Sequence, residues 1–419
     1  MTPLDAFLAV DLVPIATAVL AAVTCATLGN WLVLRKQAML GDATSHAVLP
    51  GIVVAFLVVG ARDPWSLFVG ATIAGAVAAL VAEALRRVAR IESGAALGAS
   101  LVVSFALGVY LLELGSLRNV DLDPDCVVFG SLEGLFWIPP AGASHLSPAG
   151  LSTLPGEFRA IVAVAAVSLV GERLLRGRLA IASFDPEFAE LAGARPARIA
   201  RLLVIAVAAA AVASFTAVGS ILVVALLVAP PVAARFWTDR LAVQARLSIA
   251  FAVVAALAGY AISASLPTPV NAAGTMAAMA GVLVAISIVA SPSHGALAAW
   301  RRHRELARSL AAEDMLGVLG RAAEIHAGGC DEATLVAAGG GNAAARRGFA
   351  SLRQAALIAM SDGKWMLTAA GVEVAREILS RHRGWQEFLV TRTGMSPDHA
   401  HEAAHRLEHL AANQPRDRG

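Results

Sequence analysis

Long apolar runs alternate with short polar stretches over roughly the first 290 residues of the chain. A bilayer core needs about 20 apolar residues per helix, so this pattern predicts a series of membrane-spanning helices. We expect nine, at residues 12–34, 47–61, 66–85, 95–115, 158–175, 201–217, 219–235, 246–265 and 272–290. The second run is short and the sixth and seventh nearly touch, so eight or ten spans are also compatible with the pattern.

The pattern changes near residue 295, because the chain from Trp300 onward is charged and has no run long enough to cross a bilayer. We therefore expect a membrane domain at 1–295, a linker at 296–311, a small domain at 312–412 and a tail at 413–419. Within the small domain, ALIAMSDGKWMLT predicts a β-hairpin with a turn at Asp-Gly, and residues 366–390 predict an amphipathic helix.

Composition supports this division. The chain is 58% hydrophobic and 15% charged, with a mean hydropathy of +0.69, whereas soluble proteins average about 25% charged residues. The three cysteines (Cys25, Cys126 and Cys330) show neither CxxC spacing nor a disulfide framework. The N-terminus lacks a basic region, so we interpret the first apolar segment as a retained span rather than a cleaved signal.

Basic residues fall in alternate loops, as the positive-inside rule describes for cytoplasmic loops. They lie near residues 35–36, 86–90, 173–178, 195–201, 235–246 and 301–304, while the opposite loops are acidic or neutral. The alternation predicts an N-terminus outside the cell membrane and a C-terminal domain in the cytoplasm.

The stretch RKQAMLGDATSHAVLPG (35–51) carries the first candidate chemistry. Asp42 and His46 are four residues apart at the start of an apolar run, so on a helix they share one face. Together they offer one oxygen and one nitrogen ligand to a divalent transition metal. Polar groups are costly in a membrane and often mark a functional site. The alternative is that Asp42 caps a helix and the backbone satisfies His46.

Three other segments depart from a plain apolar pattern. SFDPEFAELAGARPARIA (183–200) predicts a polar helix, with Pro186 as its start signal and Gly193 as its stop signal. Pro230-Pro231 predicts a kink or an end in the span at 219–235. Residues 138–157 are a Pro/Gly/Ser-rich insertion, which we expect outside the membrane with His145 solvated.

Four segments, LRKQAMLGDATSHAVLPG, FGSLEGL, ASFDPEFAELAG and VGSILVVALLVAPPVAARFWTDRL, resemble the membrane permease of bacterial ABC importers for zinc, manganese and iron. The resemblance implies a dimeric pore, built with a second permease copy or a paralogue. It also implies an extracytoplasmic metal-binding lipoprotein and a separate cytoplasmic ABC ATPase. The chain has no GxxxxGK[ST] phosphate loop, so we expect a transporter subunit rather than an enzyme.

The same resemblance assigns roles to residues. Asp42 and His46 would bind metal in the translocation path, and the ATPase would dock on Phe184, Asp185, Pro186, Glu187 and Phe188. A carboxylate–imidazole pair suits manganese, zinc and iron alike. We rank manganese or zinc above iron and expect no organic cofactor.

The C-terminal stretch HEAAHRLEHL (401–410) places four potential metal ligands on one helical face. With the hairpin and the following helix, it resembles the metal-sensing winged-helix repressors that respond to iron or manganese. The resemblance implies one site made by His405, Glu408 and His409, with Asp314 from an earlier helix. A second site would use His382 and His401, although Gln386 stands where an acidic residue is expected and Glu387 lies beside it.

The segment expected to read DNA, LVAAGGGNAAARRGFASLRQAA (335–356), contains three consecutive glycines that disfavour a helix. We therefore favour a cytoplasmic metal sensor that regulates transport over a DNA-binding domain. The predicted fold class is an all-α polytopic membrane protein of about nine transmembrane helices, followed by a small cytoplasmic α+β domain similar to a winged helix. The alternative functions are a membrane-anchored metal-dependent transcription regulator and a secondary transporter that needs no ATPase.

Overall fold

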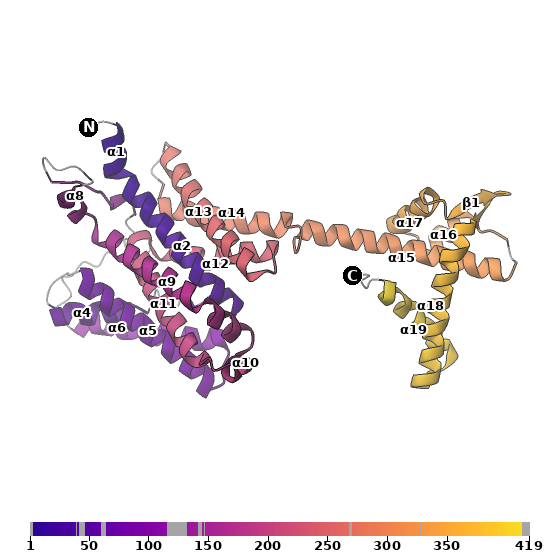
Figure 1. Ribbon diagram of the computed structural model, residues 1–419, viewed down its shortest axis with the longest axis horizontal. Helices are drawn as coiled ribbons and strands as arrows, with labels where there is room; N and C mark the ends of the chain where they lie inside the picture. The colour runs from indigo at the N-terminus through magenta and orange to yellow at the C-terminus, as the bar shows by residue number, and fades with distance from the viewer. Residues whose placement is uncertain are drawn as a thin grey trace. The chain divides into compact units, whose positions relative to one another are not determined.

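The computed structural model describes residues 3–38, 40–41, 47–59, 64–114, 132–140, 145, 147–267, 270–326 and 328–412. The chain divides into two compact units, Met1–Ala296 and Leu297–Gly419 (Figure 1). Each unit has an apolar core of its own.

The first unit is helical. Its elements are α1 (Pro3–Val10), α2 (Leu12–Leu34), α4 (Leu49–Val59), α5 (Pro64–Val88), α6 (Ser93–Leu114), the short 3-10 helix η2 (Leu132–Gly134), α8 (Pro148–Ser152), α9 (Gly156–Phe184), α10 (Pro186–Leu191), α11 (Pro196–Val218), α12 (Ser220–Trp237), α13 (Leu241–Ser265) and α14 (Ala272–Ala290). Each of the nine apolar runs contains one of these helices, so the predicted polytopic class is confirmed. Within the described residues, seven helices are long and apolar enough to span a membrane, and α4 is a shorter apolar helix.

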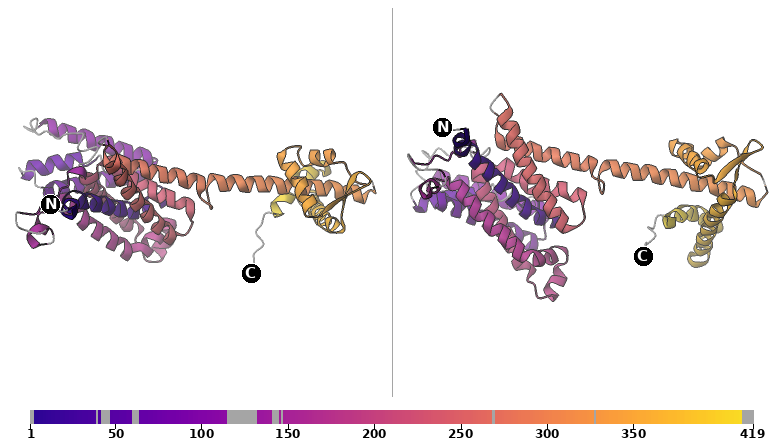
Figure 2. Two further views of the ribbon diagram at one scale, coloured as in Figure 1. Left: turned by 90° about the horizontal axis from the view of Figure 1, so that it is seen from above. Right: turned by 45° about the horizontal axis from the view of Figure 1, so that its top comes forward.

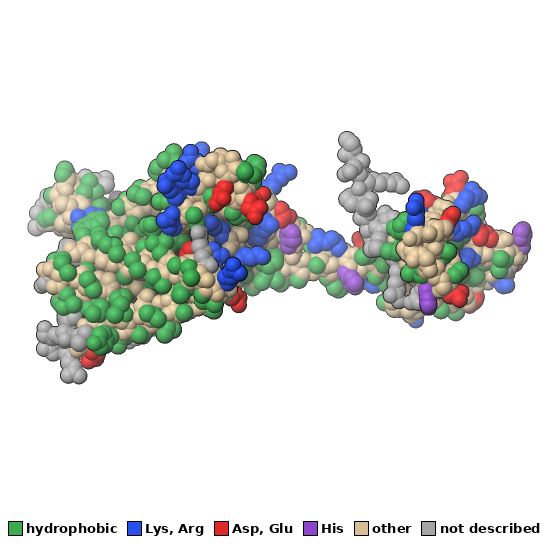
Figure 3. Space-filling view, turned by 90° about the horizontal axis from the view of Figure 1, so that it is seen from below, with side chains coloured by type: hydrophobic (Ala, Val, Ile, Leu, Met, Phe, Trp, Pro, Cys, Tyr) green, Lys and Arg blue, Asp and Glu red, His purple; other side chains and the backbone are tan. Residues whose placement is uncertain are grey.

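Helices α2, α11 and α12 form the centre of the bundle. The apolar windows of α2 and α11 are 67% and 61% buried, against 28% and 22% for α5 and α6. The long helices run alongside one another in both views of Figure 2. Hydrophobic side chains cover much of the visible surface of this unit, and Lys and Arg gather toward one of its ends (Figure 3). This distribution fits a bundle whose periphery faces lipid.

The two prolines of α12 do not end the helix, which continues to Trp237. Of the predicted kink or end, the helix end is therefore wrong. Both prolines are buried. Because proline has no N–H, the carbonyls of Leu226 and Leu227 lose their intrahelical donors. Gly29 of α2 lies against the Leu227 carbonyl, where a Cβ atom would overlap the oxygen. Close packing by a glycine therefore covers the interrupted turn.

The insertion at 138–157 is partly folded. Ser147 caps the short helix α8 through the amide of Gly150, and the buried Trp137 indole donates to the Gly150 carbonyl at 2.9 Å. His145 is half-buried, with its ring edge-on to Trp137 at 5.0 Å between centroids. The expectation of a solvated His145 is therefore wrong, because Trp137 folds back over the insertion.

The second unit contains α15 (Ala296–Glu324), α16 (Glu332–Ala338), α17 (Ala343–Gln354), β1 (Ile358–Ser361), β2 (Lys364–Leu367), α18 (Ala369–Thr393) and α19 (Pro397–Ala412). Residues 296–311 form the first half of α15. The predicted hairpin is confirmed: β1 pairs antiparallel with β2, and Asp362 and Gly363 make the turn with φ of 50° and 77°. Cys330 pairs with Trp365 as an isolated bridge beside the hairpin.

The glycines at 339–341 lie in the turn between α16 and α17 rather than in a helix. Gly340 and Gly341 have φ of 94° and 68°, a region that L side chains rarely adopt. Asn342 then caps α17 by accepting hydrogen bonds from the amides of Ala344 and Ala345. The prediction that the three glycines disfavour a helix in the segment 335–356 is therefore wrong, because α17 begins after them. The unit is a helix-turn-helix followed by a two-stranded wing, as the predicted winged-helix-like class requires.

Candidate functional site

Asp42 and His46 lie outside the described residues, but both flanks of their segment are described. Leu40 on one side and Ala47 and Val48 on the other are at most 4% exposed. Gly41 packs against the side chain of Leu227 in α12. Val48 packs in a separate apolar cluster with Ala71 of α5 and Val212 of α11. The segment therefore starts and ends inside the bundle, among three different helices.

A set of buried polar side chains joins α2 to its neighbours. The Gln244 amide of α13 donates to the Asn30 side chain at 3.3 Å, and the Ser248 hydroxyl donates to the Ala26 carbonyl at 3.5 Å. Cys25 contacts the Ser214 hydroxyl of α11 at 3.7 Å. These contacts hold α11 and α13 on the central helix. Sequence reasoning missed them, because each residue stands alone in an apolar run.

Helix α10 is a short, exposed helix between α9 and α11. The Asp185 carboxylate caps it by accepting a hydrogen bond from the Phe188 amide at 2.9 Å, and Pro186 occupies its first turn. Ala189 is fully buried, whereas Phe188 and Leu191 are 56% and 87% exposed. Glu187 and Glu190 are exposed beside them. The helix thus presents two large apolar side chains within an acidic rim.

A cavity of about 420 Å³ lies at the base of α10. Helices α5, α9, α10 and α11 and the loop after α2 line it. Its polar lining residues are Arg35, Gln37, Glu83, Arg86, Ser183, Glu190 and Arg201. Arg86 makes two hydrogen bonds of 2.9 Å to the Glu83 carboxylate in this wall. Because Arg35 and Gln37 come shortly before Asp42 in the sequence, the cavity borders both the exposed helix and the chain that leads to the predicted metal ligands.

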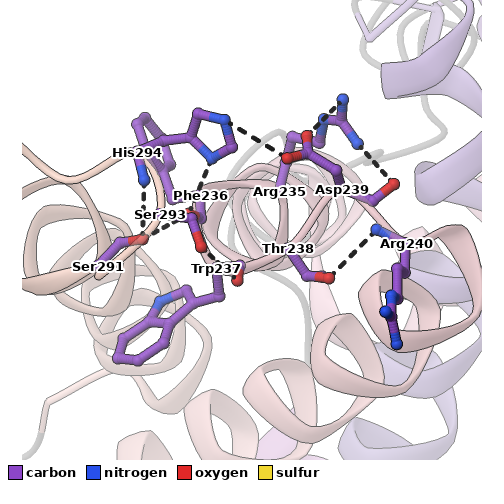
Figure 4. A network of polar contacts seen from close by, with 9 residues as sticks. All are labelled: Arg235, Phe236, Trp237, Thr238, Asp239, Arg240, Ser291, Ser293 and His294. Carbon is purple, nitrogen blue, oxygen red and sulfur yellow. Dashed lines mark hydrogen bonds and ion pairs between the residues drawn. The ribbon is translucent and has the colours of Figure 1, made fainter. Parts of the chain in front are cut away.

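Polar contacts fix the turn between α14 and α15 to the end of α12 (Figure 4). The Ser291 hydroxyl donates to the Phe236 carbonyl, and the Ser293 hydroxyl donates to the Trp237 carbonyl at 3.1 Å. His294 lies 3.6 Å from the Asp239 carboxylate. The point at which the chain leaves the bundle is therefore held to the end of a membrane helix.

In the second unit, the structure brings His382 of α18 and His401 of α19 together. His382 is 6% exposed, and its Nε2 lies 3.0 Å from Nδ1 of His401. Two nitrogens bound to one tetrahedral metal are about 3.3 Å apart, given metal–nitrogen bonds near 2.05 Å. The two nitrogens share a hydrogen bond in the structure, so chelation of a metal ion would require loss of the shared proton and rotation of the rings toward a common point. Gln386 and Glu387 lie about one turn farther along α18.

The other predicted ligands are less completely described. Asp314 is half-buried on α15, while the side chains of His405, Glu408 and His409 lie outside the described part of α19. Among the described side chains, no group of three His, Cys, Asp or Glu residues is close enough to hold a metal ion. The first predicted cytoplasmic site therefore stays a prediction.

The helix-turn-helix presents basic side chains. Arg346, Arg347 and Arg353 are all exposed on α17. At the start of α16, the Thr334 hydroxyl and amide donate to the Asp331 carboxylate. These hydrogen bonds hold the pKa of Asp331 below its ordinary value.

Comparison with known proteins identifies the first unit. The family model described as the ABC 3 transport family matches residues 12–136 and 151–306. The chain belongs to this family. It is thus a multi-pass membrane permease, and the part matched includes α10 and the flanks of the Asp42 segment.

Two curated relatives of this ABC 3 permease illustrate the range of the family. The manganese transport system membrane protein MntD of Bacillus subtilis is 36% identical over 68% of this chain and 92% of the relative. The zinc transport system membrane protein TroD of Treponema pallidum is 34% identical over 66% of this chain and 73% of the relative. Among solved structures, PsaBC from Streptococcus pneumoniae in complex with Fab has a TM-score of 0.54 and 25% identity, covering 67% of this chain and 91% of that one.

The second unit has a separate match. The family model for the iron dependent repressor, metal binding and dimerisation domain covers residues 368–418. That range contains α18, α19 and the His382–His401 pair. The resemblance to metal-dependent repressors predicted from the sequence is thus confirmed for this part of the chain.

Proposed function

We propose that the chain is the permease subunit of an ATP-driven importer of divalent metal ions, with manganese or zinc as substrate and iron ranked third. Membership of the ABC 3 family is the observation that carries the proposal. The names of MntD and TroD, which specify manganese and zinc transport, support it. In this proposal the importer also contains a second permease copy or paralogue, an ABC ATPase and an extracytoplasmic metal-binding lipoprotein.

Asp42 and His46 are the proposed metal ligands in the translocation path. A carboxylate and a neutral imidazole can both replace water around a divalent ion. The buried flanks of the segment support this role, because anchoring by Leu227, Ala71 and Val212 would hold the two ligands in a defined position. Movement of α12 or α5 would then change the site directly.

Helix α10 is the proposed docking element for the ATPase. Its exposed Phe188 and Leu191 offer apolar anchors, and the rim of acidic side chains offers charge complementarity. The cavity at its base borders Arg35 and Gln37. A shift of α10 on ATP binding could therefore reach the Asp42 segment through the walls of this cavity.

Uptake of radiolabelled manganese or zinc tests the metal pathway. Asp42→Ala and His46→Ala should each abolish uptake in cells that lack other importers, with unchanged amounts of protein in the membrane. His145→Ala is the matched control, because His145 packs on Trp137 in the insertion. Wild-type rates in both pathway variants would refute the assignment.

We also propose that the second unit senses metal on the cytoplasmic side and regulates transport. The 3.0 Å separation of His382 and His401 supports metal binding at α18 and α19. Because α15 is continuous from Ala296 to Glu324, the sensor follows directly on the helix that leaves the bundle. A chain truncated after residue 311 should still transport, but its uptake should no longer fall as cytoplasmic metal rises. Unchanged metal dependence after truncation would contradict this role.

The helix-turn-helix supports a second candidate function, a membrane-anchored transcription regulator. A helix of this motif can enter the major groove of DNA, and α17 presents three exposed arginines. Full-length protein in neutral nanodiscs should then retain sheared genomic DNA at moderate salt in the presence of metal. The R346Q/R347Q/R353Q variant should lose this retention. Equal recovery of DNA by the variant and the native protein would exclude the function.

A further inference from the structure

The first turns of α15 carry a concentrated positive charge. Residues 297–304 read LAAWRRHR, with three arginines, one histidine and no acidic residue. We name Trp300–Arg304 the WRRHR segment. Between Leu297 and Glu305, Ala298 is the one residue that is not exposed. The side chains of this segment are therefore exposed to solvent around most of the helix.

The segment also has an apolar component. Trp300 is 52% exposed and Leu297 is 41% exposed. The guanidinium of Arg304 lies over the Trp300 ring, 4.2 Å from its centroid. Spacings of three, four and seven residues put Leu297, Trp300 and Arg304 on one face of the helix, with Arg301 beside them. Tryptophan and arginine together are typical of a membrane–water interface.

The segment follows closely in sequence on an apolar span. The α14 helix is an apolar span that ends at Ala290, and the turn after it is held to the end of α12 by Ser291, Ser293 and His294 (Figure 4). An α-helix rises about 1.5 Å per residue, so Arg304 lies about 12 Å along the axis from the first residue of α15. A short tether of this kind gives the segment a high effective concentration at the membrane surface.

We propose that the WRRHR segment is a binding surface for anionic lipid headgroups of the adjoining leaflet. Clusters of arginine next to a membrane span attract anionic lipids through charge, within about one Debye length of the surface. Trp300 and Leu297 insert at the headgroup level, and Arg301 and Arg304 on the same side of the helix contact phosphates. The lipid composition of the membrane then sets how firmly the start of α15 is held.

Hydrogen–deuterium exchange on the full chain in nanodiscs tests this proposal. One set of nanodiscs contains phosphatidylcholine alone and the other also contains about one quarter phosphatidylglycerol. Exchange of peptides covering 297–304 should be slower by about tenfold or more in the anionic nanodiscs. Salt at about 0.5 M should remove most of the difference, because it screens the attraction.

Matched variants distinguish an effect of the WRRHR segment from an effect of the total positive charge of the protein. R301Q/R302Q/R304Q should lose the lipid dependence, whereas R346Q/R347Q/R353Q removes the same number of charges elsewhere and should keep it. R301K/R302K/R304K preserves the positive charge of the segment and should therefore also keep the lipid dependence. Unchanged exchange at the core residues Met315 and Leu319 checks that the domain stays folded.

Equal exchange in the two kinds of nanodisc at low salt would overturn the proposal. So would native behaviour of the glutamine variant. Protection of 297–304 by added DNA in neutral nanodiscs, without protection by phosphatidylglycerol, would assign the surface to nucleic acid instead. None of these readouts depends on metal uptake, so the result is independent of the proposed transport function.

Discussion

Gly29 of α2 packs directly against the carbonyl oxygen of Leu227 in α12, with no space for a Cβ atom between them. The same leucine contacts Gly41 through its side chain. One residue of α12 therefore touches the central helix and the start of the segment that carries Asp42 and His46.

Gly29→Ala should force α2 and α12 apart. The added methyl group meets backbone rather than a flexible side chain, so we expect a loss of about 2 kcal/mol or more in stability. Metal uptake should fall with it. Gly177→Ala in α9 is the control, because a Cβ atom there meets nothing within 4 Å. Thermal unfolding of the two purified variants compares them, and an equal melting temperature would show that the contact can relax.

Changes on α10 should uncouple the permease from the proposed ATPase. Glu187→Lys reverses a rim charge and Leu191→Ser removes the most exposed apolar side chain of the helix. Loss of charge complementarity at an interface can cost several kcal/mol, so co-purification of the ATPase and metal uptake should both decrease. Glu157→Lys is the control. It makes the same charge reversal in the first turn of α9, at the end of α9 that is not connected to α10. If both reversals have the same effect, α10 has no special role.

His382→Ala or His401→Ala should weaken metal binding by the second unit. The test uses a chain that already lacks Asp42 and His46, so that calorimetry with Mn²⁺ or Zn²⁺ reports the sensor alone. His405→Ala and His409→Ala together should remove the other predicted site.

His399→Ala supplies the control for these variants. His399 is exposed on α19 and hydrogen-bonds to Ser396, 3.0 Å away. Its removal should leave the binding isotherm unchanged. Equal binding by every histidine variant would reduce α18 and α19 to a structural role.

The Asp331 cap should make the stability of α16 depend on pH. Hydrogen bonds from Thr334 lower the pKa of Asp331 in the folded state, so the ionised carboxylate favours folding. Its contribution is present above the ordinary value near 3.9 and is lost as pH falls through the lowered value. Asp331→Asn keeps a good cap and should remove this dependence. Amide hydrogen exchange in residues 332–338, followed as pH falls, measures the stability of α16. The same pH dependence in the native protein and in Asp331→Asn would refute the role of Asp331.

The hydrophobic pattern predicted the membrane bundle well. Apolar runs identify spans by length alone, and every expected run contains a helix. The hairpin at Asp362-Gly363 and the start of α10 at Pro186 were also predicted, because these residues act through local backbone chemistry. Such features depend on a few neighbouring residues and need no knowledge of packing.

Features that depend on tertiary packing were not predicted. Pro230 and Pro231 suggest a kink or a helix end, yet α12 continues to Trp237, and Gly29 of another helix packs over the interrupted turn. Leu191 was overlooked, since only the burial of Ala189 shows which side of α10 faces outward. The spacing of histidines alone does not bring His382 of α18 and His401 of α19 together either. Their pairing was expected only through the resemblance to metal-sensing repressors.

The Pro230-Pro231 pair has a mechanical consequence for α12. Bending an ordinary helix stretches or breaks intrahelical hydrogen bonds, but two of these bonds are already missing in the turn below the prolines. This turn is therefore the most compliant point of a central helix, and it lies where Leu227 contacts Gly41. In an alternating-access cycle, α12 could flex here at little elastic cost. The strain would pass through Gly41 to the segment of the proposed ligands Asp42 and His46, while the rest of the helix moves as a rigid rod.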